Sequence, residues 1–213
     1  MKEDYGYRDK GLDRILVLSD GIFAFSLTLL ALNLVVPQLT PGQGSIELQE
    51  KLAGEITDFI IFFWSFFIVS FYWLNHHRVF RYIKRYDGIM IWCNLILLMF
   101  ITLVPFITNL NMHYGNLQVA VVISAVFYSI PGFAISILWL HSSKNHLLID
   151  KKLSKHIIKL MRNRNFVAPL VFVVSIPLSF IQPYLTIFFW VMMIPLRLIV
   201  NRKSKSLTTT KTT

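Results

Sequence analysis

The chain has 213 residues, of which 55% are hydrophobic and only 15% are charged. A soluble domain is about half apolar and about a quarter charged, so this composition excludes an ordinary soluble domain and indicates an integral membrane protein. The net charge of +10 is compatible with nucleic-acid binding, but Lys and Arg fall in four clusters between apolar segments instead of forming one patch. The single cysteine, Cys93, excludes an intrachain disulfide and offers no metal-site spacing. We therefore expect no nucleic-acid partner, no metal and no cofactor.

Apolar segments divide the chain into six expected transmembrane helices. In chain order they are Arg14–Val36, Thr57–Arg78, Ile89–Leu110, Leu117–Leu140, Phe166–Ile181 and Tyr184–Val200. The first four reach the ~20 residues that a spanning helix needs, and the last two are at the low edge of that range. We expect a kink at Pro105 and a break at Pro131-Gly132.

The segments between the spans predict an all-α membrane protein with one domain. Residues 1–13 are expected to form a cytoplasmic arm, residues 14–200 the six-helix transmembrane domain, and residues 201–213 a disordered basic tail. Residues 37–56 hold two prolines and three glycines and are expected to form a loop with a short surface helix. Residues 141–165 are basic and amphipathic, a pattern typical of a helix on the anionic cytoplasmic leaflet.

The distribution of basic residues predicts the orientation. Twenty of the 21 Lys and Arg residues lie on the side of the N-terminus, and only Lys51 lies on the other side. The positive-inside rule then places both termini in the cytoplasm of a multi-pass protein of the cell membrane. A re-entrant hairpin in place of the last two spans would leave the C-terminus on the same side, so this count leaves both arrangements open.

The first span carries costly polar residues near its start, namely Arg14, Ser19 and Asp20. A charged side chain inside a span needs a partner from another helix, and Arg14 and Asp20 face different directions at i,i+6. Span two runs back across the membrane, so His76 near its end lies at the level of Asp20. We interpret Arg14, Ser19, Asp20 and His76 as an inter-helix polar network that clamps the helices. No nucleophile with an adjacent base accompanies them, and we do not expect an enzyme.

The remainder of the first span has two faces when it is drawn as a helix. The bulky face consists of Leu18, Ile22, Phe25, Leu29, Leu32 and Val36, and the small face of Gly21, Ala24, Thr28 and Ala31. The bulky face either contacts lipid or points at a symmetry axis. In the second case the small face packs on neighbouring helices, and rings of bulky side chains form a hydrophobic constriction, which is one way in which a pore gates.

Two hydroxyl groups of this span, those of Ser26 and Thr28, could face a passing cation. The commoner arrangement for such a hydroxyl is a hydrogen bond to a carbonyl one turn earlier in the same helix.

The motif Arg14-Ile-Leu-Val-Leu-Ser19-Asp20 resembles the R-x-x-x-F-S-D signature that opens the first helix in the transmembrane protein 175 family of potassium channels. The following GIFAFSLTLLALNL, and YWLNHHRVFRY at the end of span two, resemble the prokaryotic branch of that family. Leu18 stands where the signature has phenylalanine.

The resemblance implies a homotetramer in which each subunit contributes its first helix to a potassium-permeable pore. It implies that Phe25, Leu29 and Leu32 form the constriction, that Thr28 belongs to a selectivity layer, and that Arg14, Asp20 and His76 belong to a bracing network. Potassium ions and the lipid bilayer are the implied partners. The alternative is a proton- or cation-coupled transporter in which Asp20 and His76 titrate during turnover.

Overall fold

The computed structural model describes residues 10–183, 186, 189 and 190. The helices in this part of the chain are α1 (Lys10–Leu30), α2 (Ser45–Gly54), α3 (Ile56–Tyr82), α4 (Gly88–Thr102), α5 (Val104–Tyr114), α6 (Gln118–Ser143) and α7 (Lys155–Ser179). Short 3₁₀ turns, Ala31–Asn33 and Lys144–His146, follow α1 and α6.

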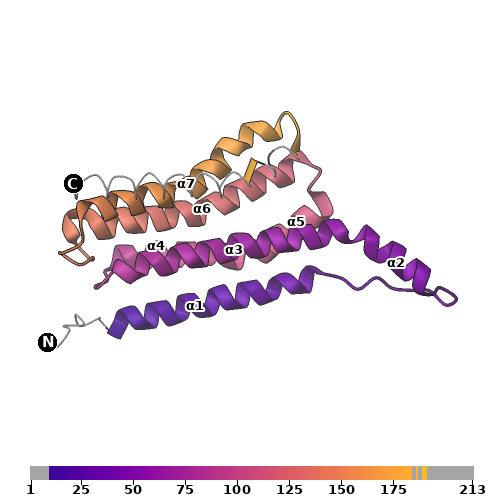
Figure 1. The fold of residues 1–213 in the computed structure, drawn as a ribbon, viewed down its shortest axis with the longest axis horizontal. Coiled ribbons are helices and arrows are strands. Elements are labelled where there is room, and N and C mark those ends of the chain that lie inside the picture. Colours follow the sequence, from indigo (N-terminus) through magenta and orange to yellow (C-terminus); the bar gives the residue numbers. More distant parts are fainter. Residues whose placement is uncertain (1–9, 184–185, 187–188, 191–213) are drawn as a thin grey trace, which may run out of the picture.

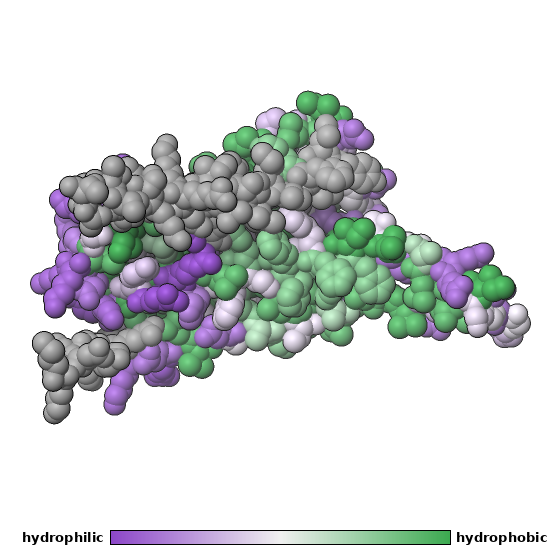
Figure 2. Space-filling view, viewed as in Figure 1, coloured by the Kyte–Doolittle hydropathy of each residue, from purple (hydrophilic) through white to green (hydrophobic). Residues whose placement is uncertain are grey.

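The long helices lie side by side and run up and down one common axis, with α2 projecting at one end (Figure 1). The end at which α1 and α7 begin is called the basic end below, because Arg78, Arg85, Lys144 and Lys155 lie at or near it. Figure 2 shows hydrophobic side chains over the middle of the molecule, hydrophilic ones gathered at the basic end and a mixture of both around α2. This distribution matches a bundle that crosses a bilayer along its long axis.

Four helical segments in the described part of the chain are long and apolar enough to cross a membrane. They are Lys10–Asn33, Ile56–Tyr82, Gly88–Tyr114 and Gln118–His146. These four match the first four predicted spans, so the chain is an all-α, multi-pass membrane protein. The sixth predicted span lies mostly outside the described residues. Its Trp190 is described, and this indole packs edge-on against Tyr128 and Phe172.

The third predicted span is broken near Pro105, whereas the fourth continues as one helix through Pro131. α4 ends at Thr102 and α5 begins at Val104, so Pro105 lies in the first turn of a new helix, where its missing N–H costs nothing. By contrast, α6 runs through Pro131 without interruption, so the predicted break at Pro131-Gly132 is wrong. Neighbouring helices can hold a proline-containing helix together in a membrane protein.

The basic connector 141–165 does not form a separate surface helix. Residues 141–143 end α6, and the loop after the turn Lys144–His146 buries Leu148 and Ile149, with Ile149 paired to Ile83 as an isolated antiparallel bridge. The last part of the connector, from Lys155, belongs to α7, which continues to Ser179. The loop contains apolar side chains because it packs against the end of the helical bundle. These apolar residues lie among basic ones, and the composition of the loop therefore resembles that of an amphipathic helix.

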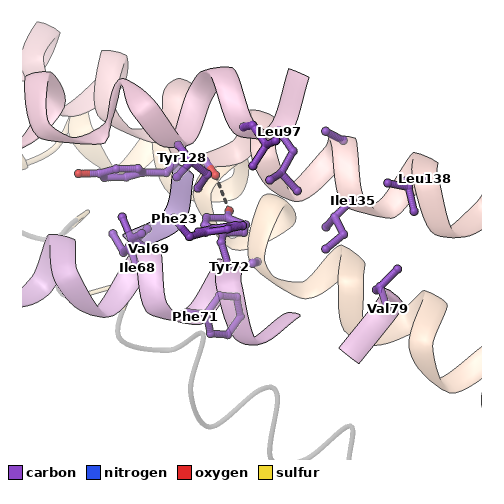
Figure 3. Close-up of a cluster of buried hydrophobic side chains, with 14 of the residues drawn as sticks. Phe23, Ile68, Val69, Phe71, Tyr72, Val79, Leu97, Tyr128, Ile135 and Leu138 are labelled. Atoms are coloured by element: carbon purple, nitrogen blue, oxygen red, sulfur yellow. Dashed lines mark hydrogen bonds between the residues drawn. The ribbon is translucent and has the colours of Figure 1, made fainter. Parts of the chain in front are cut away.

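The core lies where α1, α3, α4, α6 and α7 converge. Figure 3 shows its centre, in which the Tyr72 hydroxyl donates to the Tyr128 backbone oxygen among buried aliphatic and aromatic side chains. Phe23 brings α1 into this cluster and is 1% exposed. Among the described helices, α6 and α7 pack against each other most extensively.

Gly132 allows α6 and α7 to approach this closely. A methyl group at this position would lie 2.7 Å from Cδ of Pro169, a rigid ring on α7. We expect Gly132→Ala to lower the free energy of unfolding by about 1–3 kcal/mol, the usual cost of overpacking. Gly54→Ala is the control, because nothing lies within 4 Å of its added methyl group. Thermal unfolding in detergent measures both, and equal melting temperatures would contradict the close packing.

Asp87 joins the start of α4 to the end of α6 at the basic end. It caps α4 by accepting a hydrogen bond from the Met90 amide (2.9 Å), and its other oxygen lies 2.6 Å from His141 Nε2 at the end of α6. Partial burial raises the pKa of the Asp87 carboxyl, but the hydrogen bonds from Met90 and His141 outweigh this effect, and the pKa lies below its ordinary value of 3.8. The charged form is therefore the one that the fold favours.

This lowered pKa predicts an acid-sensitive contribution to stability. The contribution of Asp87 is complete above the ordinary carboxyl pKa and disappears as the pH falls through the lowered value. We expect Asp87→Ala to cost about 1 kcal/mol at neutral pH, the typical effect of a lost N-cap. The difference in melting temperature from the unmodified chain should shrink at about pH 3. A difference that does not change with pH would contradict the assignment.

Candidate pore helix and its bracing network

Helix α1 has one buried and one exposed side. The buried side consists of Leu12, Ser19, Phe23, Ser26 and Leu30, which recur every three or four residues over most of the helix and face α3, α4 and α5. The exposed side carries Val17 (74% exposed) and Phe25 (62%), and Leu32 (76%) follows in the 3₁₀ turn Ala31–Asn33. An apolar strip therefore runs from Val17 to Leu32 and is not covered by the described residues of its own subunit.

The three residues of the predicted constriction lie along or beside this strip. Phe25 and Leu32 are exposed, and Leu29 is half-buried at its edge. None of them belongs to the buried core of the subunit. Their side chains are thus available to lipid or to other subunits, and they contribute little to the fold of the single chain.

The small face is not covered by the other described helices of the subunit. Gly21, Ala24, Thr28 and Ala31 are all exposed. The contacts that hold α1 in the bundle are made instead by the stripe that contains Ser19, Phe23 and Ser26. Small residues allow helices to approach closely, so the small face remains a surface on which another helix can pack.

The two hydroxyl candidates have different surroundings. Thr28 is exposed, and its Oγ1 donates to the Phe25 carbonyl oxygen at 2.8 Å, so only the lone pairs of this oxygen remain available. Ser26 lies on the buried side of α1 and does not face the exposed strip. Of the two, only Thr28 can present oxygen to an ion that passes along the strip.

A buried chain of hydrogen bonds ties α1 to α4 and α3. Ser19 Oγ donates to the Ile15 carbonyl oxygen (2.8 Å) and accepts from Asn94 Nδ2 (3.0 Å). Asn94 Oδ1 lies 2.9 Å from His76 Nε2. Because Asn94 donates through its nitrogen and accepts through its oxygen, the proton of the His76 ring is on Nε2. All three side chains are at most 1% exposed.

Aromatic rings enclose His76. Its ring stacks on Phe80 with 4.1 Å between centroids and lies 5.6 Å from the ring of Phe23 on α1. The imidazole is 0% exposed and held by one asparagine and two phenylalanines. This arrangement fixes the ring between α1 and α3, as a clamp requires.

The other two predicted members lie outside this chain of hydrogen bonds. Asp20 is exposed and accepts a hydrogen bond from Trp73 Nε1 on α3 (2.9 Å). Arg14 is also exposed, and no described hydrogen bond or ion pair joins it to Asp20 or His76. Within the subunit, Ser19 and His76 are thus linked through Asn94, whereas Arg14 contacts neither of its predicted partners, Asp20 and His76.

Asn94 and Trp73 are the functional candidates that the sequence prediction missed. Asn94 interrupts the apolar run IMIWCNLILLMF, and an uncharged polar residue inside a span needs a partner in the same way as a charged one. That signal was available in the sequence. Its partners were not, because Ser19 and Asn94 are 75 positions apart.

At the opposite end, Asn33 completes the attachment of α1. Its Nδ2 donates to the Pro105 carbonyl oxygen in the first turn of α5, at 3.1 Å. The break between α4 and α5 therefore supports the 3₁₀ turn that follows α1.

Comparisons with known proteins agree with this architecture. The family described as endosomal/lysosomal potassium channel TMEM175 matches residues 14–105. A potassium channel of Chamaesiphon minutus is 30% identical over 177 residues, which cover 82% of this chain and 87% of that protein. The chain belongs to the TMEM175 family. A potassium channel of Streptomyces collinus is 29% identical over 178 residues, which cover 82% of this chain and 85% of that protein.

Solved TMEM175 structures share the fold. The crystal structure of a lysosomal potassium-selective channel TMEM175 homolog from Chamaesiphon minutus matches with a TM-score of 0.77 and 28% identity, over 91% of this chain and all of the other. A variant of the potassium channel MtTMEM175, in complex with a nanobody fusion protein, matches with a TM-score of 0.64 and 19% identity, over 97% of this chain and 99% of the other. This second likeness bears on the fold alone. Membership of the family agrees with the expectation of a channel and not an enzyme.

Proposed function

We propose that this TMEM175 protein is a potassium-permeable channel that conducts passively through a central pore lined by α1. The observation that carries the proposal is the apolar strip of α1, which includes Phe25 and Leu32 and is not covered by the described residues of the subunit. The relatives named potassium channel cover more than four fifths of the chain and support the choice of ion.

In the proposed assembly, four subunits place their α1 helices around one axis. The small face, with Gly21 and Ala24, then packs against the neighbouring α1, and the bulky face points inward. Rings of Phe25, Leu29 and Leu32 form a dry constriction, which closes the pore by excluding water. Thr28 contributes the oxygen atoms of a selectivity layer beside it, since its lone pairs are not used by the backbone bond to Phe25.

The buried network acts as a brace in this proposal. Ser19, Asn94 and His76 hold α1 against α4 and α3, so that the exposed strip keeps one orientation towards the axis. Arg14 and Asp20 are exposed in the subunit. They lie on the surface where a second subunit would complete the network predicted from the sequence.

The proposed topology has six spans in the cell membrane and both termini in the cytoplasm. The basic end faces the cytoplasm, in agreement with the positive-inside rule. The acidic residues Glu47, Glu50 and Asp58 lie near the opposite end with α2, where they attract cations towards the outer entrance.

Electrical recording from the purified protein in planar bilayers tests the function. A channel should show unitary currents with potassium on both sides and no other gradient. Saturable flux without unitary currents, strictly coupled to pH, would overturn the proposal in favour of the transporter in which Asp20 and His76 titrate. Crosslinking of the protein in detergent tests the tetramer separately.

A further inference from the structure

A cavity of about 600 Å³ opens at the basic end, between the last turn of α6 and the first turns of α7. Five basic side chains line it, those of Lys144, His146, Lys155, Lys159 and Arg162. Of the described residues that line it, none carries a carboxylate. Four permanent positive charges around one hollow repel each other, and an anion in the hollow would relieve this repulsion.

The arrangement of α7 focuses this charge. Lys155, Lys159 and Arg162 are spaced i, i+4 and i+7, and these positions share one helical face. Lys155 is also the first residue of the helix, so the positive end of the α7 dipole lies at the cavity. Both contributions favour a negatively charged group at the same place.

The loop that supplies the other wall is held in a strained conformation. Asn145 and His146 have φ angles of 50° and 55°, which residues other than glycine rarely adopt. His146 Nε2 bonds the Leu153 carbonyl oxygen (3.1 Å), and the Leu148 amide donates to the Ser142 carbonyl oxygen (3.0 Å). The strained turn keeps Lys144 and His146 at the cavity, and such strain clusters at ligand sites.

The cavity also has an apolar border. Leu140 and Ile158 line it, and Leu140 is 40% exposed. Leu147 follows the strained turn and is 45% exposed. A free phosphate ion would gain nothing from these side chains, whereas the glycerol and upper acyl carbons of a phospholipid would cover them.

We propose that this cavity binds the phosphate headgroup of an anionic phospholipid, with the acyl chains directed along the apolar surface of α6 and α7. Basic pockets between transmembrane helices on the cytoplasmic side are suited to such headgroups. The lipid would tie the start of α7 to the end of α6. The inference rests on the proposed function only in assigning this end to the cytoplasmic leaflet.

Native mass spectrometry of the full chain with added phosphatidylglycerol or phosphatidylcholine tests the site without any measurement of ion flux. The test variant is Lys155→Gln/Lys159→Gln/Arg162→Gln. The matched control is Lys84→Gln/Arg85→Gln/Lys151→Gln, which removes three charges from the same end outside the cavity lining. Lys159→Glu serves as a single substitution, and thermal unfolding confirms that each variant is folded.

We expect the unmodified chain to retain phosphatidylglycerol over phosphatidylcholine. The test variant should lose about a hundredfold in affinity, since it removes three basic residues and each basic residue near an anionic lipid contributes about fivefold. The control should change much less, and Lys159→Glu should weaken binding in the same direction as the test variant. Equal losses in test and control variants would overturn the proposal, because binding would then follow total charge. Inorganic phosphate that competes with the lipid at equal concentration would also overturn it, because the site would then recognise phosphate alone.

Discussion

Phe25→Ala should raise the potassium conductance of single channels by at least about twofold, because it removes the largest side chain of the proposed constriction and widens a dry gate. The same substitution should leave the folding of the subunit nearly unchanged, since Phe25 is 62% exposed and lies outside the core. Planar-bilayer recording measures the conductance, and thermal unfolding measures the fold.

Phe106→Ala is the matched control for this experiment. Phe106 is 61% exposed and lies on α5, outside the α1 strip. The two substitutions remove the same atoms at the same exposure, so a difference in conductance reports position alone. Equal conductance in both variants would place Phe25 against lipid and remove α1 from the pore.

Asn94→Ala should cost about 1–3 kcal/mol in the free energy of unfolding, the range for leaving a buried polar group without its partner. His76 Nε2 loses its acceptor, and Ser19 Oγ loses its donor. A hydrogen bond between membrane helices contributes about 0.6 kcal/mol to stability on average. Most of the expected loss therefore comes from the unsatisfied imidazole of His76 and from the lost packing. Unfolding by SDS in mixed micelles measures the change.

Asn109→Ala is the control for the bracing network. Asn109 lies on α5 and is exposed, so its removal deletes an amide of the same size without opening the core. The brace also predicts that Asn94→Ala broadens the distribution of conductance levels, because α1 is less firmly oriented. If the Asn94→Ala and Asn109→Ala variants have the same free energy of unfolding, Asn94 does not brace α1.

Apolar runs predicted the helices well because a bilayer leaves the backbone few alternatives. Every N–H and C=O group in hydrocarbon needs an internal partner, so a run of about 20 apolar residues becomes a helix. The helices α1, α3 and α6 follow this rule. The connector 141–165 lies outside the apolar runs, so this rule does not apply to it. Its mixture of apolar and basic residues is found both in the buried loop at Leu148 and in the first turns of α7.

Prolines show where local sequence was insufficient. Pro105 and Pro131 are both inside predicted spans, but only the first coincides with a break between helices. The difference arises from the neighbouring helix. α7 packs Pro169 against Gly132 and supports α6 across the missing hydrogen bond.

For the candidate site, the amino-acid sequence was enough to identify the costly residues and the faces that α1 can present. Ser19 and His76 were identified because polar groups in a span need partners, and the exposed strip contains Phe25 and Leu32 as the helical period requires. These properties depend on neighbours within one helix, where the geometry is known in advance.

The partners of these residues became known from the tertiary structure alone. It supplied Asn94 as the link between Ser19 and His76, gave Trp73 to Asp20, and showed that the small face of α1 is not packed inside the subunit. The physical reason is that hydrogen bonds between helices depend on their relative rotation and height. Those quantities result from the packing of all the helices together, and no single span encodes them.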